Sequence, residues 1–301
     1  MNKDFFSHWM RYADDSVKLT ELVMPGAHNA GSYGMKRIAR CQEDRILEQY
    51  LHGARQFCVR MHQKDGKLYL SHGLIMGRPF VEALEDFKKI IETYDDFFII
   101  NLREYQPQKL LFTERTYRAD AEKVEPLLKE YIQPEKYAFY DFDNISDVTL
   151  GDIRRSGKKY LLINYKQDYA YSRDCVELLP WDKKIHGSKI DRFLKHSPTL
   201  IEEANPNGLY IYQSQRTAGV GTNVGMFTPP RKMDRDMGKK FFVLIEKIAT
   251  NPELLKKINI IGADFLTDNF DKSRAIIYLN LLKNNVRCEL IEEFKANLIG
   301  D

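Results

Sequence analysis

The chain of 301 residues carries 46 basic and 43 acidic side chains, which gives a formal net charge of +3. This small excess argues against a nucleic-acid partner, and a hydrophobic content of 43% is enough to bury a full core. The longest apolar runs, such as residues 97–100, are far shorter than the roughly 20 residues of a membrane span. We therefore expect a globular protein that neither crosses a membrane nor binds nucleic acid.

The N-terminal residues 1–15 lack the apolar segment of a secretory signal. The chain is therefore expected to be either cytoplasmic or a secreted mature form from which a signal has been removed. Four cysteines are scattered without a CxxC pair, which favours free thiols over a zinc motif or a disulfide framework. They are Cys41, Cys58, Cys175 and Cys288.

Short apolar runs rich in β-branched and aromatic residues predict strands, and amphipathic segments between most of them predict helices. The predicted strands are residues 19–24, 56–61, 67–70, 97–102, 159–165, 209–212 and 258–264. The predicted helices are residues 43–51, 78–94, 119–131, a segment near 188–195, 236–249 and 272–282. Pro79 suits the first turn of its helix, where a missing N–H costs nothing.

Alternating strands and helices imply parallel strands joined by right-handed crossovers, hence a doubly wound sheet or a closed barrel. No GxGxxG follows the first strand, and the glycine-rich residues 219–225 contain no P-loop, so neither nucleotide motif is present. No linker or repeat divides the chain, which indicates one domain spanning residues 1–301.

Polar residues stand at the ends of several predicted strands, where barrel enzymes carry their chemistry. His28 follows the first strand, Arg60 ends the second, His72 lies in the next hairpin, Arg103 ends the fourth, and Asp264 ends the last. One histidine can serve as a base and the other as an acid, while arginine neutralises charge on a phosphate. An aspartate beside the base fixes its tautomer. This pattern predicts phosphodiester cleavage without a metal or another cofactor, because no HExxH and no run of acidic ligands accompanies it.

These residues resemble the X domain of the phosphatidylinositol-specific phospholipases C, of the bacterial, metal-independent type. LVMPGAHNAGSY is similar to the LSIPGTHDSG-type opening of that family, and YLHGARQFCVRMHQKDGKLYLSHGL to its second block. FFIINLREY is similar to the third block, and GADF to the late strand that ends in aspartate. Four such motifs in the family's order are specific, although the likeness is strong only in the first hundred residues.

The resemblance implies a single irregular (βα) barrel of the TIM type that cleaves phosphatidylinositol to diacylglycerol and inositol 1,2-cyclic phosphate. The enzyme would be a phosphatidylinositol diacylglycerol-lyase, and glycosylphosphatidylinositol anchors are a further possible substrate. It would touch the membrane peripherally and act as a monomer.

Carried over by motif, His28 would be the general base, Asp264 its orienter, His72 the general acid and Arg60 the phosphate ligand. Substrate contacts are expected from Arg103, Lys166 and Tyr212, the last by stacking on the inositol ring.

Two residues depart from the bacterial pattern. Asn29 replaces the aspartate that follows the first histidine, and Cys58 replaces a second carboxylate near Arg60. Slower turnover or altered hydrolysis of the cyclic product would follow from these changes. Asn164 stands where bacterial members offer an arginine to inositol, and Lys166 follows it, so an altered head-group preference is a further expectation.

Several alternatives remain open on the sequence. The chain could act on soluble diesters of the glycerophosphoinositol type, or it could be a degenerate barrel that binds inositol phosphates without turnover. Arg60 and Asp264 could instead form a purely structural ion pair. The loop of residues 218–230 is a candidate for membrane contact or for a lid.

Overall fold

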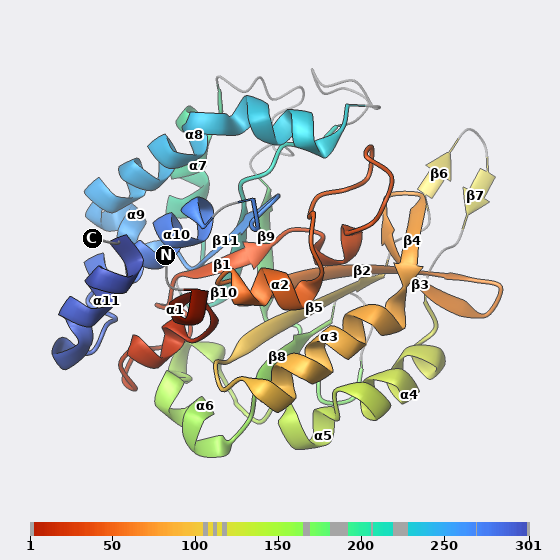
Figure 1. Ribbon diagram of the computed structural model, residues 1–301, viewed down its shortest axis with the longest axis horizontal. Helices are drawn as coiled ribbons and strands as arrows, with labels where there is room; N and C mark the ends of the chain where they lie inside the picture. Colours follow the sequence, from red (N-terminus) through yellow and green to blue (C-terminus); the bar gives the residue numbers. More distant parts are fainter. Residues whose placement is uncertain are drawn as a thin grey trace.

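The computed structural model describes residues 3–104, 108–110, 113–115, 119–164, 169–180, 192–205, 207–218, 228–268 and 270–299. At its centre is a curved sheet in which seven strands run parallel, flanked by helices on its outer side (Figure 1). Their order is β9 (Val176–Pro180), β10 (Leu209–Gln213), β11 (Ile260–Ala263), β1 (Met24–Ala27), β2 (Gln56–Lys64), β5 (Phe98–Glu104) and β8 (Tyr160–Ile163).

The sheet forms an irregular TIM-type barrel, as expected. Its two outermost parallel strands are β8 and β9, and in the described residues no ladder joins them. One isolated bridge, between Ile163 and Arg173, links β8 to the segment just before β9. The barrel therefore has one weak seam, and the opposite side of the sheet carries continuous ladders.

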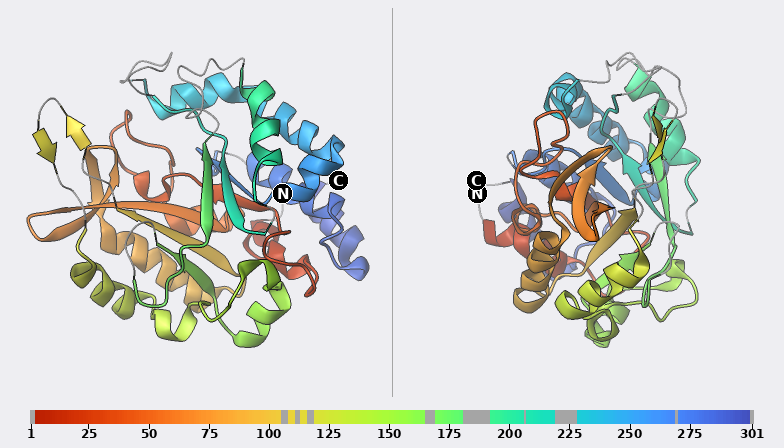
Figure 2. Two further views of the ribbon diagram at one scale, coloured as in Figure 1. Left: turned by 180° about the vertical axis from the view of Figure 1, so that it is seen from behind. Right: turned by 90° about the vertical axis from the view of Figure 1, so that its right-hand side faces the viewer.

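A hairpin extends one of the central strands. β3 (Lys67–His72) pairs antiparallel with β2, and β4 (Ile75–Pro79) pairs with β3. Figure 2 shows the turn between β2 and β3 reaching beyond the barrel. The short strands β6 (Gln108–Leu110) and β7 (Thr113–Arg115) form a separate two-stranded sheet.

The helices follow the strands in the order that a (βα) barrel requires. They are α1 (Lys3–Ser7), α2 (Ile46–Leu51), α3 (Phe80–Thr93), α4 (Ala121–Tyr131), α5 (Pro134–Tyr137), α6 (Leu150–Ser156), α7 (Phe193–Glu202), α8 (Pro230–Thr250), α9 (Pro252–Lys257), α10 (Asp271–Leu282) and α11 (Ile291–Ile299). α8 is kinked at Gly238, whose φ of 39° suits glycine. None of the helices in the described ranges combines the length and apolarity of a membrane span.

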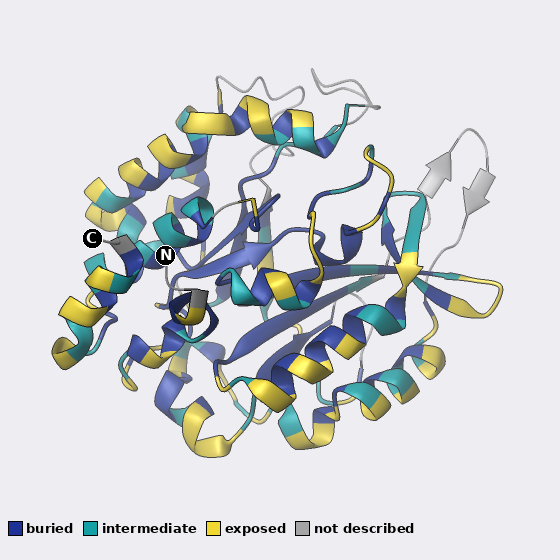
Figure 3. Cartoon of the chain, in the orientation of Figure 1, coloured by how far each residue is buried: buried dark blue, intermediate teal, exposed yellow. Residues whose placement is uncertain are grey.

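Strand residues alternate between two hydrophobic clusters, as the period of two requires. Ile100, Leu162 and Ile261 join the cluster that contains the outer helices, together with Phe87 of α3 and Leu244 of α8. Their strand neighbours belong to a second cluster with the N-terminal segment. These are Ile99, Leu161, Ile211 and Ile260 with Phe6 and Trp9. Figure 3 shows the strands buried between exposed outer faces of the helices.

The prediction of a strand at residues 19–24 was wrong in its bounds, since β1 begins only at Met24. Leu19 and Leu22 are buried but lie before the strand, where the Asn259 side chain donates hydrogen bonds to both of their carbonyl groups. Of the helix predicted near residues 188–195, the structure describes only the part from Arg192 onward. There α7 begins at Phe193. Strands β4, β6, β7 and β9 and the helices α1, α5, α6, α9 and α11 were not predicted.

Candidate active site

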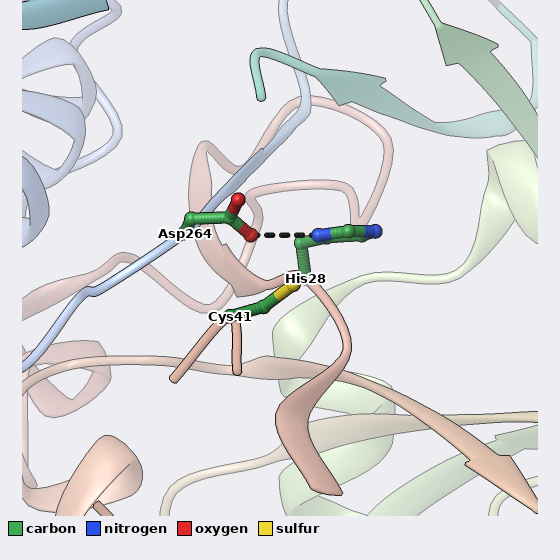
Figure 4. A group of neighbouring side chains, drawn as sticks. All are labelled: His28, Cys41 and Asp264. Atoms are coloured by element: carbon green, nitrogen blue, oxygen red, sulfur yellow. Dashed lines mark hydrogen bonds and ion pairs between the residues drawn. The ribbon is translucent and has the colours of Figure 1, made fainter. Parts of the chain in front are cut away.

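The catalytic pair expected from the sequence stands at the ends of two neighbouring strands. β1 and β11 are parallel, with Ala27 opposite Ala263, so the next residue of each strand, His28 and Asp264, meets the other. His28 Nδ1 lies 2.7 Å from Asp264 Oδ1, and both side chains are buried (Figure 4). Residues 236 positions apart in the chain thus form one unit.

The tautomer of His28 follows from its second partner. Arg60 Nη2 lies 2.9 Å from His28 Nε2. A guanidinium group can only donate hydrogen bonds, so Nε2 accepts and Nδ1 carries the proton that it donates to Asp264. His28 therefore separates Arg60 from Asp264 in this chain of contacts, and the two charged groups do not form the direct structural pair that the sequence left open.

Burial and positive neighbours keep the imidazole neutral. Burial, followed by the charges of Arg60 and Arg103, lowers the pKa of His28 well below its ordinary value. Burial raises the pKa of Asp264 to about 7, although Lys272, His72 and Arg60 act in the opposite direction. The site therefore holds a neutral base next to a carboxyl group, and a positive charge formed on His28 would favour the ionised form of this carboxyl group.

The second histidine faces the first from the hairpin. His72 ends β3, and its ring is perpendicular to that of His28, with 6.3 Å between ring centroids. His72 Nδ1 donates a hydrogen bond of 2.6 Å to the carbonyl oxygen of Ala39, which leaves Nε2 as the nitrogen available to a substrate. Burial and the charge of Arg60 lower the pKa of His72 to about 4.

Two arginines supply the positive charge of the site. Arg60 on β2 and Arg103 on β5 are register partners on adjacent parallel strands. Burial acts to raise the pKa of the Cys58 thiol, but the charges of Arg60 and Arg103 outweigh burial and lower this pKa. The structure therefore brings His28, His72, Arg60, Arg103 and Asp264 to one end of the barrel.

Asn29 is completely buried and lies in the left-handed region, with a φ of 46°. Asparagine tolerates this conformation better than most residues. Burial raises the pKa of the Cys41 thiol well above its ordinary value, and the Asn29 side chain acts in the opposite direction without reversing this shift. The Asn29 backbone amide contributes to the lowered pKa of the Cys58 thiol. Asn29 is thus part of the cluster and forms the turn that aims His28.

Tyr212 corrects the sequence-based expectation of a ring that stacks on inositol. Its side chain is completely buried, and its hydroxyl group hydrogen-bonds to Ser197 on α7. Tyr212 belongs to the cluster of the outer helices, whereas its neighbour Ile211 belongs to the other cluster. It faces the helices and does not line the site. Lys166 and most of the loop 218–230 lie outside the described residues.

Sequence reasoning missed Cys41, which no spacing connects to the histidines. The segment after η2 (Ala30–Ser32) folds back over the strand ends, because the backbone amides of Cys41 and Gln42 both donate to the Ser32 hydroxyl oxygen. The Gln42 side chain then donates to the carbonyl groups of His28 and Ala263. Cys41 Sγ consequently lies 3.6 Å from His72 Nδ1.

The backbone of Asp264 is held by a lysine on the side away from His28. Lys272 on α10 donates 2.5 and 2.6 Å hydrogen bonds to the Asp264 backbone carbonyl and to Asp234 on α8. A cavity of about 190 Å³ lies on this side, lined by residues that include Asp234, Phe241, Asp264 and Lys272. It opens beside Asp264 and not over His28, so it is distinct from the place where a phosphate would meet Arg60.

Comparisons with known proteins give short matches in sequence and long matches in structure. No family model matches the chain. A stretch of 100 residues is 29% identical to a 1-phosphatidylinositol phosphodiesterase of Staphylococcus aureus strain Newman, covering 31% of this chain and 32% of that protein. A second stretch of 109 residues is 28% identical to a PI-PLC X domain-containing protein of Dictyostelium discoideum, covering 29% and 18%. These matches span about a third or less of the relatives.

The solved structures match over nearly the whole chain. The phosphatidylinositol-specific phospholipase C from Listeria monocytogenes superposes with a TM-score of 0.67 at 19% identity, covering 91% of this chain and 98% of that one. A point mutant of the Staphylococcus aureus enzyme gives 0.62 at 18% identity, covering 93% and 96%. The fold is that of the bacterial phosphatidylinositol-specific phospholipases C. The resemblance noted in the sequence is thereby confirmed, and with it the irregular barrel.

Proposed function

We propose that the protein is a metal-independent phosphodiesterase that cleaves phosphatidylinositol-type lipids to diacylglycerol and inositol 1,2-cyclic phosphate. The observation that carries this proposal is the chain of contacts from Asp264 through His28 to Arg60, facing His72. It provides a base, its orienter, a cation and an acid in one place. The named activities of the relatives and of the structural neighbours support the same substrate class.

The first step uses the contact between Arg60 and His28. In the substrate-free site, Arg60 occupies the lone pair of His28 Nε2. A phosphate anion competes for the guanidinium group, because charged, paired hydrogen bonds to phosphate are stronger than one to a neutral imidazole. Nε2 is then released to take the proton of the inositol 2-hydroxyl group, whose oxygen attacks phosphorus. Asp264 stabilises the imidazolium ion that forms.

The second step breaks the bond between phosphorus and the glycerol oxygen. His72 Nε2 donates a proton to this leaving oxygen, while the Ala39 carbonyl group holds Nδ1 in place. The pKa of His72 is about 4 in the substrate-free site, and a phosphate anion raises it by favouring the charged imidazole. Arg103 and Lys166 are the proposed further contacts to the phosphate and the head group, and Asn29 holds the turn.

A lipid substrate requires peripheral contact with a membrane. Phe242 and Val243 on α8 are 40% and 37% exposed, and Phe242 also lines the cavity beside Asp264. Membrane binding of the Staphylococcus aureus enzyme is the subject of one of the matching structures. We propose that this face of α8, with the loop 218–230, touches the bilayer.

The test follows phosphatidylinositol cleavage by phosphorus NMR in the presence of EDTA. We expect cyclic inositol phosphate from the unaltered protein and a loss of at least about 100-fold in kcat for His28→Ala. His196→Ala on α7 is the matched control and retains activity. Absence of the cyclic product, or full activity of His28→Ala, would contradict the mechanism.

Two further substrates separate the alternatives. Glycerophosphoinositol cleaved as fast as micellar lipid would favour a soluble diesterase, and release of an anchored protein would extend the substrate class to glycosylphosphatidylinositol. Binding of inositol phosphates without turnover of any diester would favour the degenerate barrel, for which Asn29 and Cys58 provide the motive.

A further inference from the structure

Three different types of metal ligand converge at the end of the barrel. A ring nitrogen of His28, Sγ of Cys41 and a carboxylate oxygen of Asp264 all lie within 4.8 Å of one another. All three residues are buried, and Figure 4 shows their side chains turned toward one another from three separate segments of the chain. They share no motif spacing, which is why the cysteine pattern of the sequence gives no sign of them.

We propose that His28, Cys41 and Asp264 form a binding site for Zn²⁺, and that the bound ion switches the enzyme off. The binding rests on the ligand geometry alone, and the inhibition rests on the proposed function. One imidazole, one thiolate and one carboxylate are the ligand types of zinc sites that keep a fourth position for water. A single carboxylate beside a soft thiol does not suit Ca²⁺ or Mg²⁺, which take mostly oxygen ligands.

The required movements are small. Tetrahedral zinc with bonds of about 2.0–2.3 Å holds its ligand atoms about 3.3–3.5 Å apart. The three atoms therefore need to approach from at most 4.8 Å, while the His28–Asp264 contact opens from 2.7 Å. Rotations of the Cys41 and Asp264 side chains supply displacements of this size, and the barrel strands can remain in place.

Charge is balanced on binding. Zinc is ligated by a thiolate, so the Cys41 proton is released to solvent as the Zn–S bond forms. The thiolate and the Asp264 carboxylate then offset both charges of the ion, which a buried site requires. Arg60 and Arg103 oppose a further cation nearby, so we expect reversible binding that EDTA removes.

Binding of the ion removes the catalytic base whichever ring nitrogen it uses. A bond from Nε2 to zinc occupies the lone pair that would accept the substrate proton. A bond from Nδ1 moves the imidazole proton to Nε2, which then neither accepts from Arg60 nor accepts from the inositol hydroxyl group. In both cases Asp264 also ceases to orient His28.

The first experiment measures binding without any substrate. Co²⁺ is titrated into the purified full chain, and we expect a near-ultraviolet thiolate-to-cobalt charge-transfer band that Zn²⁺ abolishes by displacement. In Cys41→Ser the band disappears, and calorimetry gives a Kd for Zn²⁺ at least tenfold weaker. Cys58→Ser, which removes another buried thiol, keeps the band. Circular dichroism and the melting temperature check the fold, and Cys41→Ala repeats the measurement if the serine variant unfolds.

The second experiment measures inhibition of phosphatidylinositol cleavage. We expect Zn²⁺ to inhibit the unaltered protein, EDTA to restore it, and Cys41→Ser to resist inhibition. A cobalt spectrum without the thiolate band, or an unchanged Kd in Cys41→Ser, overturns the zinc site. A band in a protein that cleaves no phosphatidylinositol would leave the zinc site standing and reject the proposed function instead.

Discussion

At the level of single residues, Asp264 accepts hydrogen bonds at two groups. Its carboxylate accepts from His28, and its backbone carbonyl accepts from Lys272. Lys272 in turn pairs with Asp234, the pKa of which burial raises in spite of that partner. A cation thus ties the end of β11 to both α8 and α10, and it positions the carboxylate without touching His28.

We predict that Lys272→Met lowers kcat about tenfold with little change in KM, because a carboxylate out of place orients the base poorly. Steady-state kinetics on phosphatidylinositol tests this, with Lys272→Arg expected to recover part of the loss. Lys295→Met on α11, which changes an exposed lysine, serves as the control. Equal losses in kcat and in folded fraction would indicate a structural role only.

The sequence predicted some of these residues and not others for a physical reason. His28 and Asp264 directly follow the parallel strands β1 and β11, and the ends of parallel strands gather at one edge of the sheet. The prediction that Arg60 ends its strand was wrong, because β2 continues to Lys64 and forms a hairpin with β3, the strand that ends in His72. Tyr212 was assigned to the site through the family resemblance, but on β10 it is the register partner of Ile261, and both belong to the cluster of the outer helices. Cys41 arrives through a loop held by Ser32 and Gln42, and no local pattern encodes such a fold-back.

At the level of elements, α10 ends at Leu282 and is followed by the partly buried Lys283. Lys283 Nζ donates to the carbonyl groups of Lys256 and Ile258, at 3.2 and 3.0 Å, and so connects α10 to the segment that leads into β11. Burial lowers the pKa of Lys283 to about 8 from an ordinary 10.5. Folding therefore disfavours the charged form of this lysine.

The sign of the resulting pH dependence follows directly. Between pH 8 and pH 10.5 the unfolded chain holds the Lys283 proton more firmly than the folded chain, so this group makes the protein more stable as pH rises. We predict that the free energy of unfolding of the unaltered protein, minus that of Lys283→Met, increases by up to about 3 kcal/mol across this window. Urea unfolding at a series of pH values measures it. A difference that stays constant with pH would contradict the prediction.

The predicted and observed strands show which elements the hydrophobic pattern of the sequence can locate. The β-branched and aromatic runs correctly located β2, β3, β5, β8, β10 and β11. β8, β10 and β11 are buried on both faces and read as continuous apolar runs, whereas β3 buries mainly one face. β9 was missed, since it includes the charged Glu177 and ends in proline. It owes its existence to the ladder with β10, which is a tertiary effect.

At the level of the whole molecule, one buried ion pair joins the N-terminal segment to the barrel. Arg55, just before β2, is completely buried and pairs with Asp96 at 2.7 Å. It also donates to the carbonyl groups of Phe6 and Ser7, and its guanidinium stacks 4.0 Å from the ring centroid of Tyr50. Its charge is thus paired and its terminal nitrogens donate to separate parts of the chain, while Nε is buried without a hydrogen-bond partner among the described residues.

We predict that Arg55→Leu lowers the free energy of unfolding by about 3–5 kcal/mol, because it leaves the Asp96 carboxylate buried without its partner. Denaturant unfolding measures the change. Arg155→Leu, which removes an exposed pair with Asp152, should change stability by no more than about 1 kcal/mol. Similar effects of the two substitutions would show that burial does not set the strength of the Arg55 pair.

The neighbouring positions of β1 and β11 also have a consequence for the time course of synthesis. His28 leaves the ribosome early, but Asp264 follows only 236 residues later. At elongation rates of about 5–20 residues per second, this interval lasts roughly 10–50 s. On the proposed function, a nascent chain therefore lacks the partner of its catalytic base until translation is nearly complete. A transcript cut short before β11 would encode His28 without Asp264, and its product would not cleave the lipids of the cell that makes it.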